Sequence, residues 1–223
     1  MKKALSVTIS IIISLSMLAI ITLTCLQYVA FNGTDWYRKE YTKYDVLEDV
    51  HKPYTMDEIL GITAEMQDYM MVEKDSLPDF FTEREKLHLK DCRDIIAFLK
   101  KLRPVLIAVV IVLGAAYIYL SRKDPRRSAK RFTITYAATV VAVGVLTLLL
   151  VLSGGFEDVF IGFHHMVFDN DLWLLDQAEA DLINLLPLGF FSDTVQKTAL
   201  LIVAAEAVII AILAFVTSKL PRT

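Results

Sequence analysis

Four long stretches of the chain are almost entirely hydrophobic, and polar residues fill the segments between them. The apolar runs are Ala4 to Leu26, Pro104 to Leu120, Phe132 to Leu152 and Thr198 to Val216. Each is close to the ~20 residues that a helix needs to cross the ~30 Å hydrocarbon core of a bilayer. We therefore predict an all-α, polytopic membrane protein whose four transmembrane helices cover residues 4–26, 104–120, 132–152 and 198–217.

The composition agrees with this pattern. Hydrophobic residues make up 55% of the 223 residues, and the mean hydropathy of +0.50 is too high for ordinary soluble domains. The first apolar run is longer than the core of a secretory signal peptide, and no small-residue cleavage site follows it. We therefore expect this run to be a retained membrane anchor.

Basic residues are unevenly distributed between the segments that link the apolar runs. Those at the ends and in the short link are Lys2, Lys3, six residues of the segment 121–131, Lys219 and Arg222. The positive-inside rule makes both termini and the link 121–131 cytoplasmic. The longer loops, 27–103 and 153–197, then lie outside, and residues 154–193 include acidic residues but no Lys or Arg.

Both long loops carry helical signals. Thr55-Met-Asp-Glu58 and Thr82-Glu-Arg-Glu85 match the capping box, in which Thr and Glu satisfy free backbone amides at a helix start. They predict two short helices, from about Met56 to Met71, before the Pro78 region, and from about Glu83 to Arg103, where Pro104 opens the second span.

The second loop is more apolar than a loop in solvent. Phe156, Phe160, Phe163 and Val167 recur at helical spacing, and a half-buried return segment closes the loop at residues 185–191. We expect an interfacial helix here, so that the two loops together form a small outer helical cap.

All four histidines fall in these loops, at His51, His88, His164 and His165. His88 belongs to an apolar stripe with Cys92, Ile95, Leu99 and Leu102. Asp91 follows one turn later, close enough to orient or charge-stabilise the imidazole. A packed histidine with an exposed Asp is the simpler interpretation, and a proton-transfer residue is the functional one.

His164 also faces apolar residues, among them Phe160 and Phe168. Because desolvation favours a neutral imidazole, two such histidines from separate loops suggest a pocket for an amphipathic ligand. His165 points about 100° away on a helix and is the weaker candidate.

Other chemistries have weaker signals. His88, Asp91, Cys92 and His164 could ligate a metal, but no H-E-x-x-H or C-x-x-C occurs. A serine hydrolase lacks its G-x-S-x-G turn, and there is no phosphate-binding glycine loop and no outer basic patch for nucleic acid. Cys25 and Cys92 are the only cysteines, and a single bridge between them is conceivable.

Glu206 is the only acidic residue inside a predicted span, about 13 Å along the fourth helix from Lys197 at ~1.5 Å per residue. An unpaired carboxylate there is costly, so Glu206 is expected to be protonated or hydrogen-bonded. A functional role and an interhelical hydrogen bond to Ser or Thr are both open.

Three stretches resemble the lipoprotein intramolecular transacylases of low-GC Gram-positive bacteria. They are Tyr54-Thr-Met-Asp-Glu-Ile-Leu60, Glu83-Arg-Glu-Lys-Leu-His88-Leu-Lys-Asp91 and Phe163-His164-His-Met-Val-Phe168-Asp-Asn170-Asp-Leu-Trp173. The resemblance covers essentially the whole chain, and it departs at Gln177, where such sequences often have Pro.

The resemblance implies an enzyme of the bacterial cytoplasmic membrane, active at the outer leaflet. It would move the sn-2 acyl chain of an S-diacylglyceryl cysteine to the α-amino group, giving a lyso-form lipoprotein. The implied partners are the diacylated lipoprotein N-terminus and membrane lipid, with no cofactor, no metal and no nucleic acid.

On this basis His88, oriented by Asp91, is expected to deprotonate the amine, while His164 stabilises the oxyanion or protonates the leaving oxygen. The two roles could be swapped. Asn170 and Trp173 are expected to support the site. Two alternatives are a non-enzymatic membrane sensor or chaperone and a metal-dependent membrane hydrolase.

Overall fold

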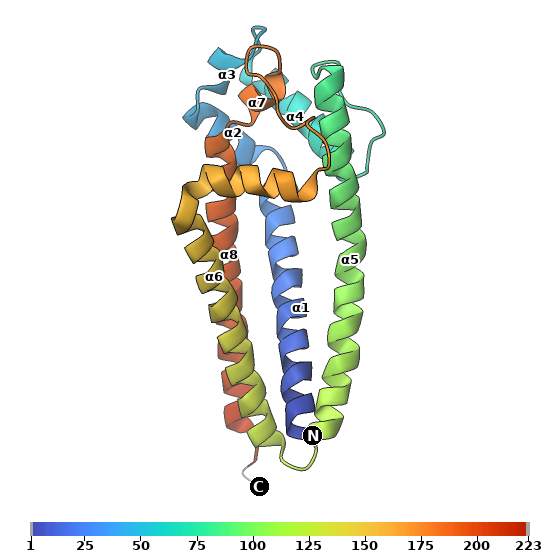
Figure 1. Ribbon diagram of the computed structural model, residues 1–223, viewed down its shortest axis with the longest axis vertical. Helices are drawn as coiled ribbons and strands as arrows, with labels where there is room; N and C mark the ends of the chain where they lie inside the picture. Colours follow the sequence, from blue (N-terminus) through green and yellow to red (C-terminus); the bar gives the residue numbers. More distant parts are fainter. Residues whose placement is uncertain (1, 222–223) are drawn as a thin grey trace. The chain divides into compact units, whose positions relative to one another are not determined.

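A computed structural model describes residues 2–221 and contains eight helices and no strand within that range (Figure 1). In chain order the helices are α1 (Lys2–Phe31), α2 (Asp35–Lys43), α3 (Val46–Asp49), α4 (Met56–Met70), α5 (Glu83–Ser121), α6 (Pro125–Val167), α7 (Asp181–Leu185) and α8 (Leu188–Lys219). Arg222, one of the basic residues used to orient the chain, lies outside the described residues.

The chain divides into two compact units. The span unit comprises Met1–Cys25, Lys101–Ser153 and Thr198–Thr223, and the loop unit comprises Leu26–Lys100 and Gly154–Lys197. The loop unit therefore contains both predicted outer loops almost completely.

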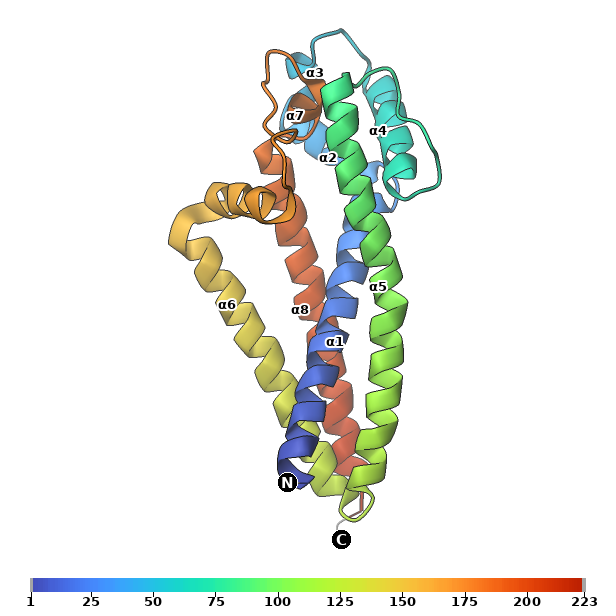
Figure 2. The same cartoon turned by 45° about the vertical axis from the view of Figure 1, so that its right-hand side comes forward.

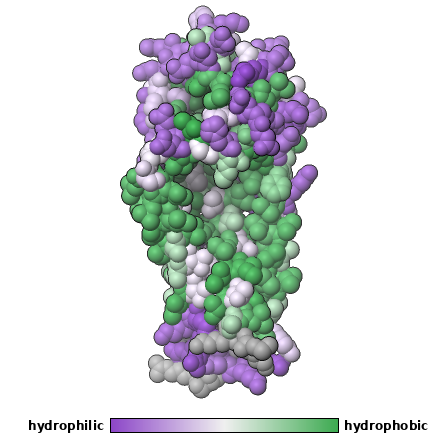
Figure 3. All heavy atoms as spheres, viewed as in Figure 1, coloured by the Kyte–Doolittle hydropathy of each residue, from purple (hydrophilic) through white to green (hydrophobic). Residues whose placement is uncertain are grey.

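Four helices, α1, α5, α6 and α8, are long and apolar enough to cross a membrane. The predicted all-α fold with four transmembrane helices is confirmed. On the face drawn in Figure 3, hydrophobic side chains cover the helices of the span unit. Ile118 and Leu200 each keep 73% of their surface exposed, as expected for side chains that face lipid.

Helix α5 is much longer than a bilayer is thick. Its 39 residues extend over ~58 Å at ~1.5 Å per residue, whereas the hydrocarbon core is ~30 Å. Its first half, Glu83–Arg103, carries many charged residues, which are costly in hydrocarbon, so we expect the apolar run 104–120 to be the part that spans the bilayer. His88 and Asp91 precede this run.

The helix boundaries differ from the sequence expectation at Pro104. We expected a helix to end at Arg103 and a new one to open at Pro104, but Pro104 lies inside a continuous α5. The proline ring fixes φ near a helical value, so the helix can continue, although the ring removes the hydrogen bond to the carbonyl of Lys100 and crowds that carbonyl.

Helix α6 joins two elements that the sequence separates. It begins at Pro125, and Asp124 Oδ1 caps this end by accepting a hydrogen bond of 3.1 Å from Arg127 N. The link between the two helices is therefore shorter than the predicted 121–131. It also continues past the predicted span end at residue 152. Gly155, with φ 79°, interrupts it, and residues 156–167 form the helix predicted for the second loop.

Glu206 makes an interhelical hydrogen bond, which was one of the two interpretations left open by the sequence. Its partner differs from the expected Ser or Thr. Tyr136 on α6 donates to Glu206 Oε2 over 2.6 Å, so the partner is a tyrosine rather than Ser or Thr. Both side chains are almost fully buried. The bond holds α8 against α6 within the span unit.

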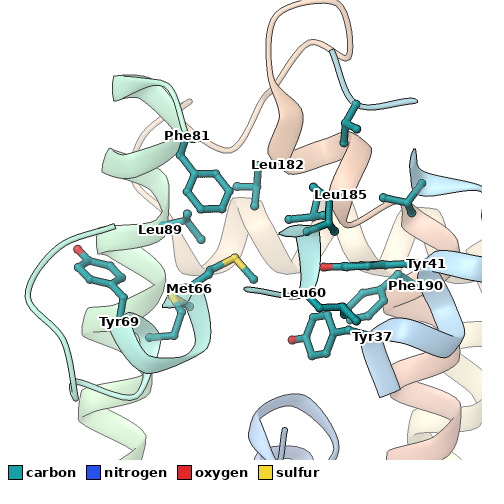
Figure 4. Packing of buried hydrophobic residues seen from close by; sticks show 14 residues of the cluster. Tyr37, Tyr41, Leu60, Met66, Tyr69, Phe81, Leu89, Leu182, Leu185 and Phe190 are labelled. Atoms are coloured by element: carbon teal, nitrogen blue, oxygen red, sulfur yellow. The ribbon is translucent and has the colours of Figure 1, made fainter. Parts of the chain in front are cut away.

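The loop unit has a hydrophobic core of its own. Helix α2 contacts α3 and α4, and α3 contacts α7, which agrees with the views in Figure 1 and Figure 2. Figure 4 shows core side chains from five helices pointing toward one another: Tyr37, Tyr41, Leu60, Met66, Leu89, Leu182, Leu185 and Phe190. Helices α2, α3 and α7 were not predicted, because each is too short to show a clear period.

Helix α4 begins as predicted, with a complete capping box. Thr55 N donates to Glu58 Oε2 over 2.7 Å, and Glu58 N donates to Thr55 Oγ1 over 3.3 Å. The helix ends at Met70, within one residue of the predicted Met71. The residue that stops it is Val72, whose φ of 63° does not fit a right-handed helix, and the chain has therefore left the helix before Pro78.

Candidate functional site

The loop unit brings His88 and His164 together. The two imidazole rings come from different loops, and their centroids lie 6.2 Å apart with an angle of 35° between the ring planes. Each residue keeps only 8% of its surface exposed. The two buried imidazoles therefore lie close enough together for one reacting group to reach both.

His164 is surrounded by aromatic rings. The centroids of Phe160, Phe163, Phe168 and Trp173 lie 4.3, 5.5, 5.6 and 4.9 Å from its ring centroid. Its Nδ1 lies 2.7 Å from the Phe160 carbonyl oxygen. Because a carbonyl can only accept, Nδ1 carries a proton and the lone pair of a neutral His164 is on Nε2.

His88 lies on the first turns of α5 and packs against Phe168, with ring centroids 5.1 Å apart. Burial, and then the charge on His164, lowers the pKa of His88, and Asp91 opposes both, so that the pKa is about 4. His88 is therefore a neutral imidazole in the pH range of cells.

Cys92 follows His88 by one helical turn and touches its ring. The Sγ atom lies 3.6 Å from His88 Nε2. Burial, and then the charge of Asp91, raises the pKa of Cys92 to about 12. Cys92 is thus a thiol rather than a nucleophilic thiolate. Cys92 and Cys25 are both free, so the conceivable bridge between them is absent.

Asp91 has a different contact from the one expected. Its Oδ2 accepts a hydrogen bond of 2.9 Å from Asn170 Nδ2, and no hydrogen bond joins it to His88 within residues 2–221. Asp91 therefore acts on His88 only through its charge, while it ties α5 to the turn that follows α6.

Arg84 makes a second contact with the same turn, which no sequence pattern predicted. Its guanidinium donates to the backbone carbonyls of Asp171 and, over 3.3 Å, Leu174. Trp173 lies between these two residues. Arg84 and Asn170 thus fix the turn that holds the Trp173 indole against His164.

Glu85 has a role beyond its predicted capping box. It is fully buried, and its carboxylate accepts hydrogen bonds from Thr82 N over 2.6 Å and from Leu182 N over 2.5 Å. The second bond reaches α7, so Glu85 joins the two loops one turn before His88. The capping box revealed the local bond, whereas nothing in the sequence pointed to Leu182.

The other two histidines lie apart from the pair. His51 Nδ1 is 2.6 Å from Asp181 Oδ1, in a polar contact between the α3–α4 connection and α7. His165 is exposed and meets the edge of Trp173 at 5.0 Å. Over residues 2–221, no group of three or more His, Cys, Asp or Glu side chains has metal-binding geometry.

The fold and this site define a class: an all-α, membrane-integral protein with four transmembrane helices, whose loops enclose a pair of buried histidines. The model of the family "Lipoprotein intramolecular transacylase Lit" matches residues 10–191. The chain belongs to this family, and its general function is that of a lipoprotein transacylase, an acyltransferase that acts on lipoproteins.

Solved structures show the same fold. The lipoprotein intramolecular transacylase Lit from Bacillus cereus is 21% identical, with a TM-score of 0.77 over 97% of each chain. A second structure of that protein, in which a histidine is replaced by arginine, is 20% identical, with a TM-score of 0.78 over 97% of this chain and 94% of the other. A third carries alanine in place of a histidine and has a TM-score of 0.75 at 20% identity, over 97% of this chain and 96% of the other. Comparison with curated proteins gives no match.

Proposed function

We propose that His88 and His164 catalyse acyl transfer within one diacylglyceryl lipoprotein, from the glyceryl sn-2 ester to the cysteine α-amine. The observation that carries the proposal is the 6.2 Å separation of two buried imidazoles from separate loops. A tetrahedral centre between the rings would have one imidazole beside the amine and the other beside the ester oxygens.

The substrate supplies both reacting groups. A bond forms between the amine nitrogen and the acyl carbon, the bond between that carbon and the glyceryl oxygen breaks, and the amine proton ends on the glyceryl oxygen. The product is an isomer of the substrate. The protein therefore has to fold the substrate into attack geometry and move one proton, and no acyl-enzyme is needed.

His164 is the better proton carrier of the two. Its Nδ1–H donates to the Phe160 carbonyl, and this hydrogen bond persists and strengthens when Nε2 takes up a proton. The same Nε2 can then return the proton to the leaving glyceryl oxygen. His164 thus fits the combined role of base and acid.

His88 is better suited to the oxyanion. A pKa near 4 makes it a weak proton acceptor, whereas a neutral imidazole N–H is a good donor to a developing negative charge in a site without water. These roles are the reverse of those expected from the sequence. The reason is the burial of His88, which outweighs the charge of Asp91.

The aromatic rings around the pair suit an acyl substrate. Phe160, Phe168 and Trp173 offer apolar contacts and exclude water from the reacting centre. By the distribution of basic residues, the loop unit faces the outer side of the bacterial cytoplasmic membrane. The lipidated N-terminus of a lipoprotein would reach the site at the outer leaflet.

Four variants test the proposal with a synthetic diacylated lipopeptide. Because substrate and product have equal mass, fragment-ion mass spectrometry must locate the acyl chain on the amine. We expect His164→Ala and His164→Gln each to lose about 10²–10⁴-fold in rate, the usual contribution of a general acid–base. His88→Ala should lose about 10²–10³-fold, and His88→Gln less, because the amide retains a donor.

His51→Ala and His165→Ala are the matched controls and should retain activity. Full activity of His164→Ala or His88→Ala would remove that residue from the mechanism. Equal losses in His88→Gln and His88→Ala would restore His88 to a proton-transfer role. A chelator arm completes the assay, because a metal-dependent hydrolase would lose activity with chelator and release free fatty acid.

A further inference from the structure

Two lysines of the loop unit meet over one indole ring. Lys197 Nζ lies 3.8 Å from the Trp36 ring centroid, and Lys39 Nζ lies 5.2 Å from it. Trp36 itself is held in place, since its Nε1–H donates to Thr194 Oγ1 over 3.0 Å. The cluster combines segments that are far apart in the sequence, so its assembly depends on the fold.

Neither of these two lysines has a carboxylate within 4.0 Å among residues 2–221. Neighbouring cations differ: Lys43 is ion-paired with Asp193, and Arg38 binds Asp57 over 2.7 Å. Two like charges at one ring repel each other, and one aromatic face compensates little of that repulsion.

The position of the cluster in the chain indicates that it lies at the surface of the membrane. Lys197 directly precedes the fourth membrane-spanning segment, 198–217, and is only partly exposed. Burial, and then the charge of Lys39, lowers the pKa of Lys197, and Glu40 opposes both. Lysine and tryptophan at the end of a span lie at the level of the lipid headgroups.

We propose that Trp36, Lys39 and Lys197 bind the phosphate of an anionic membrane phospholipid. Two ammonium groups would donate to the phosphate oxygens, while the indole face lies against the glycerol. The S-diacylglyceryl group of the proposed substrate carries no phosphate, so the occupant is a separate lipid. This inference does not depend on the proposed acyl transfer.

The chain offers a fluorescent reporter, because Trp36 and Trp173 are its only tryptophans. In the full chain with Trp173→Phe, Trp36 is the sole emitter. The protein is reconstituted in phosphatidylcholine vesicles that contain a minor fraction of chain-brominated lipid, either phosphatidylglycerol or phosphatidylcholine. We expect the brominated anionic lipid to quench Trp36 more strongly at equal mole fraction.

Charge variants then test the lysines. Each of Lys39→Gln and Lys197→Gln should lower the preference for the anionic lipid about fivefold, the effect of one charge near an anionic surface. Lys39→Arg with Lys197→Arg should retain it. Lys52→Gln with Lys90→Gln removes two exposed charges elsewhere and should change it little.

Two further arms complete the design. Native mass spectrometry measures how much phosphatidylglycerol is retained by the unaltered chain and by the variant that combines Lys39→Gln with Lys197→Gln, and it gives the same comparison without Trp173→Phe. Inorganic phosphate, compared with chloride at equal ionic strength, tests for a free anion. Equal quenching by both lipids, equal losses in the control pair, or competition by inorganic phosphate would each overturn the proposal.

Discussion

Asn170 and Asp91 lie 79 positions apart in the sequence and are joined by a hydrogen bond of 2.9 Å from Nδ2 to Oδ2. Asp91 stands on the helix that carries His88, and Asn170 stands on the turn between His164 and Trp173. This contact is one of several that connect the two loops supplying the histidine pair. Asp91 therefore contacts the other loop and does not make the direct orienting contact with His88 that spacing alone suggested.

Removing either partner should therefore have the same effect on activity. We expect Asp91→Ala and Asn170→Ala each to lower kcat/KM about five- to tenfold, the equivalent of about 1–1.4 kcal/mol for one hydrogen bond. The double variant should lose no more than the worse single one, because both remove the same contact. Asp94→Ala, an exposed carboxylate on the same helix, is the control. Additive losses would mean that the two residues act separately.

The protonation of His88 should show in a titration followed by NMR of labelled histidine. Its pKa is expected to be about 4 rather than 6.5. His164→Ala should raise this pKa, because it removes a like charge, and Asp91→Asn should lower it, because it removes an opposite one. A His88 that titrates near 6.5 in the unaltered protein would contradict the burial argument.

The same shift makes stability depend on pH. His88 titrates near 6.5 when unfolded and about 4 when folded, so the unfolded chain binds more protons between these values. The free energy of unfolding should therefore fall as the pH drops from 6.5 to about 4, and His88 should add no pH dependence above that window. His88→Gln should remove this part of the pH dependence in thermal unfolding.

The two capping boxes provide a matched pair of stability variants. Glu85 is fully buried and also accepts from Leu182 N, whereas Glu58 is exposed and has only its local partners. Glu85→Ala leaves buried amides without an acceptor and should cost about 1–3 kcal/mol of stability. Glu58→Ala should lower the unfolding temperature in detergent much less. Similar shifts would show that the bond to Leu182 contributes little.

The buried carboxyl group of Glu206 should stabilise the packing of α8 against α6. Tyr136→Phe removes the donor to Glu206 Oε2 and should cost about 1 kcal/mol, within the range of interhelical hydrogen bonds in membranes. Thr133→Val tests another α6–α8 contact, a 3.2 Å hydrogen bond to Thr217, and serves as the comparison. Thermal unfolding in detergent measures the stability of both variants. An unchanged unfolding temperature of Tyr136→Phe would show that Glu206 finds another partner.

The length and spacing of apolar residues predicted the four spans, because a bilayer requires about 20 apolar residues in each helix. Local patterns also predicted the start of α4 and the helix of residues 156–167 that carries His164. The ends of elements were predicted less well. In a linear pattern, Pro104 and Gly155 both resemble helix boundaries. In the structure, however, α5 continues through Pro104, whereas α6 is interrupted at Gly155 and then resumes.

The sequence by itself determined that the chain is a membrane-integral helical protein and that His88 and His164 face apolar surroundings, since both follow from local periodicity. Only the tertiary structure decided that the two rings meet, that Asp91 binds Asn170, and that Arg84 and Glu85 tie the loops together. These contacts join residues far apart in the chain, and no local spacing encodes them. The depressed pKa of His88 also belongs to the fold, because desolvation depends on everything that packs around the ring.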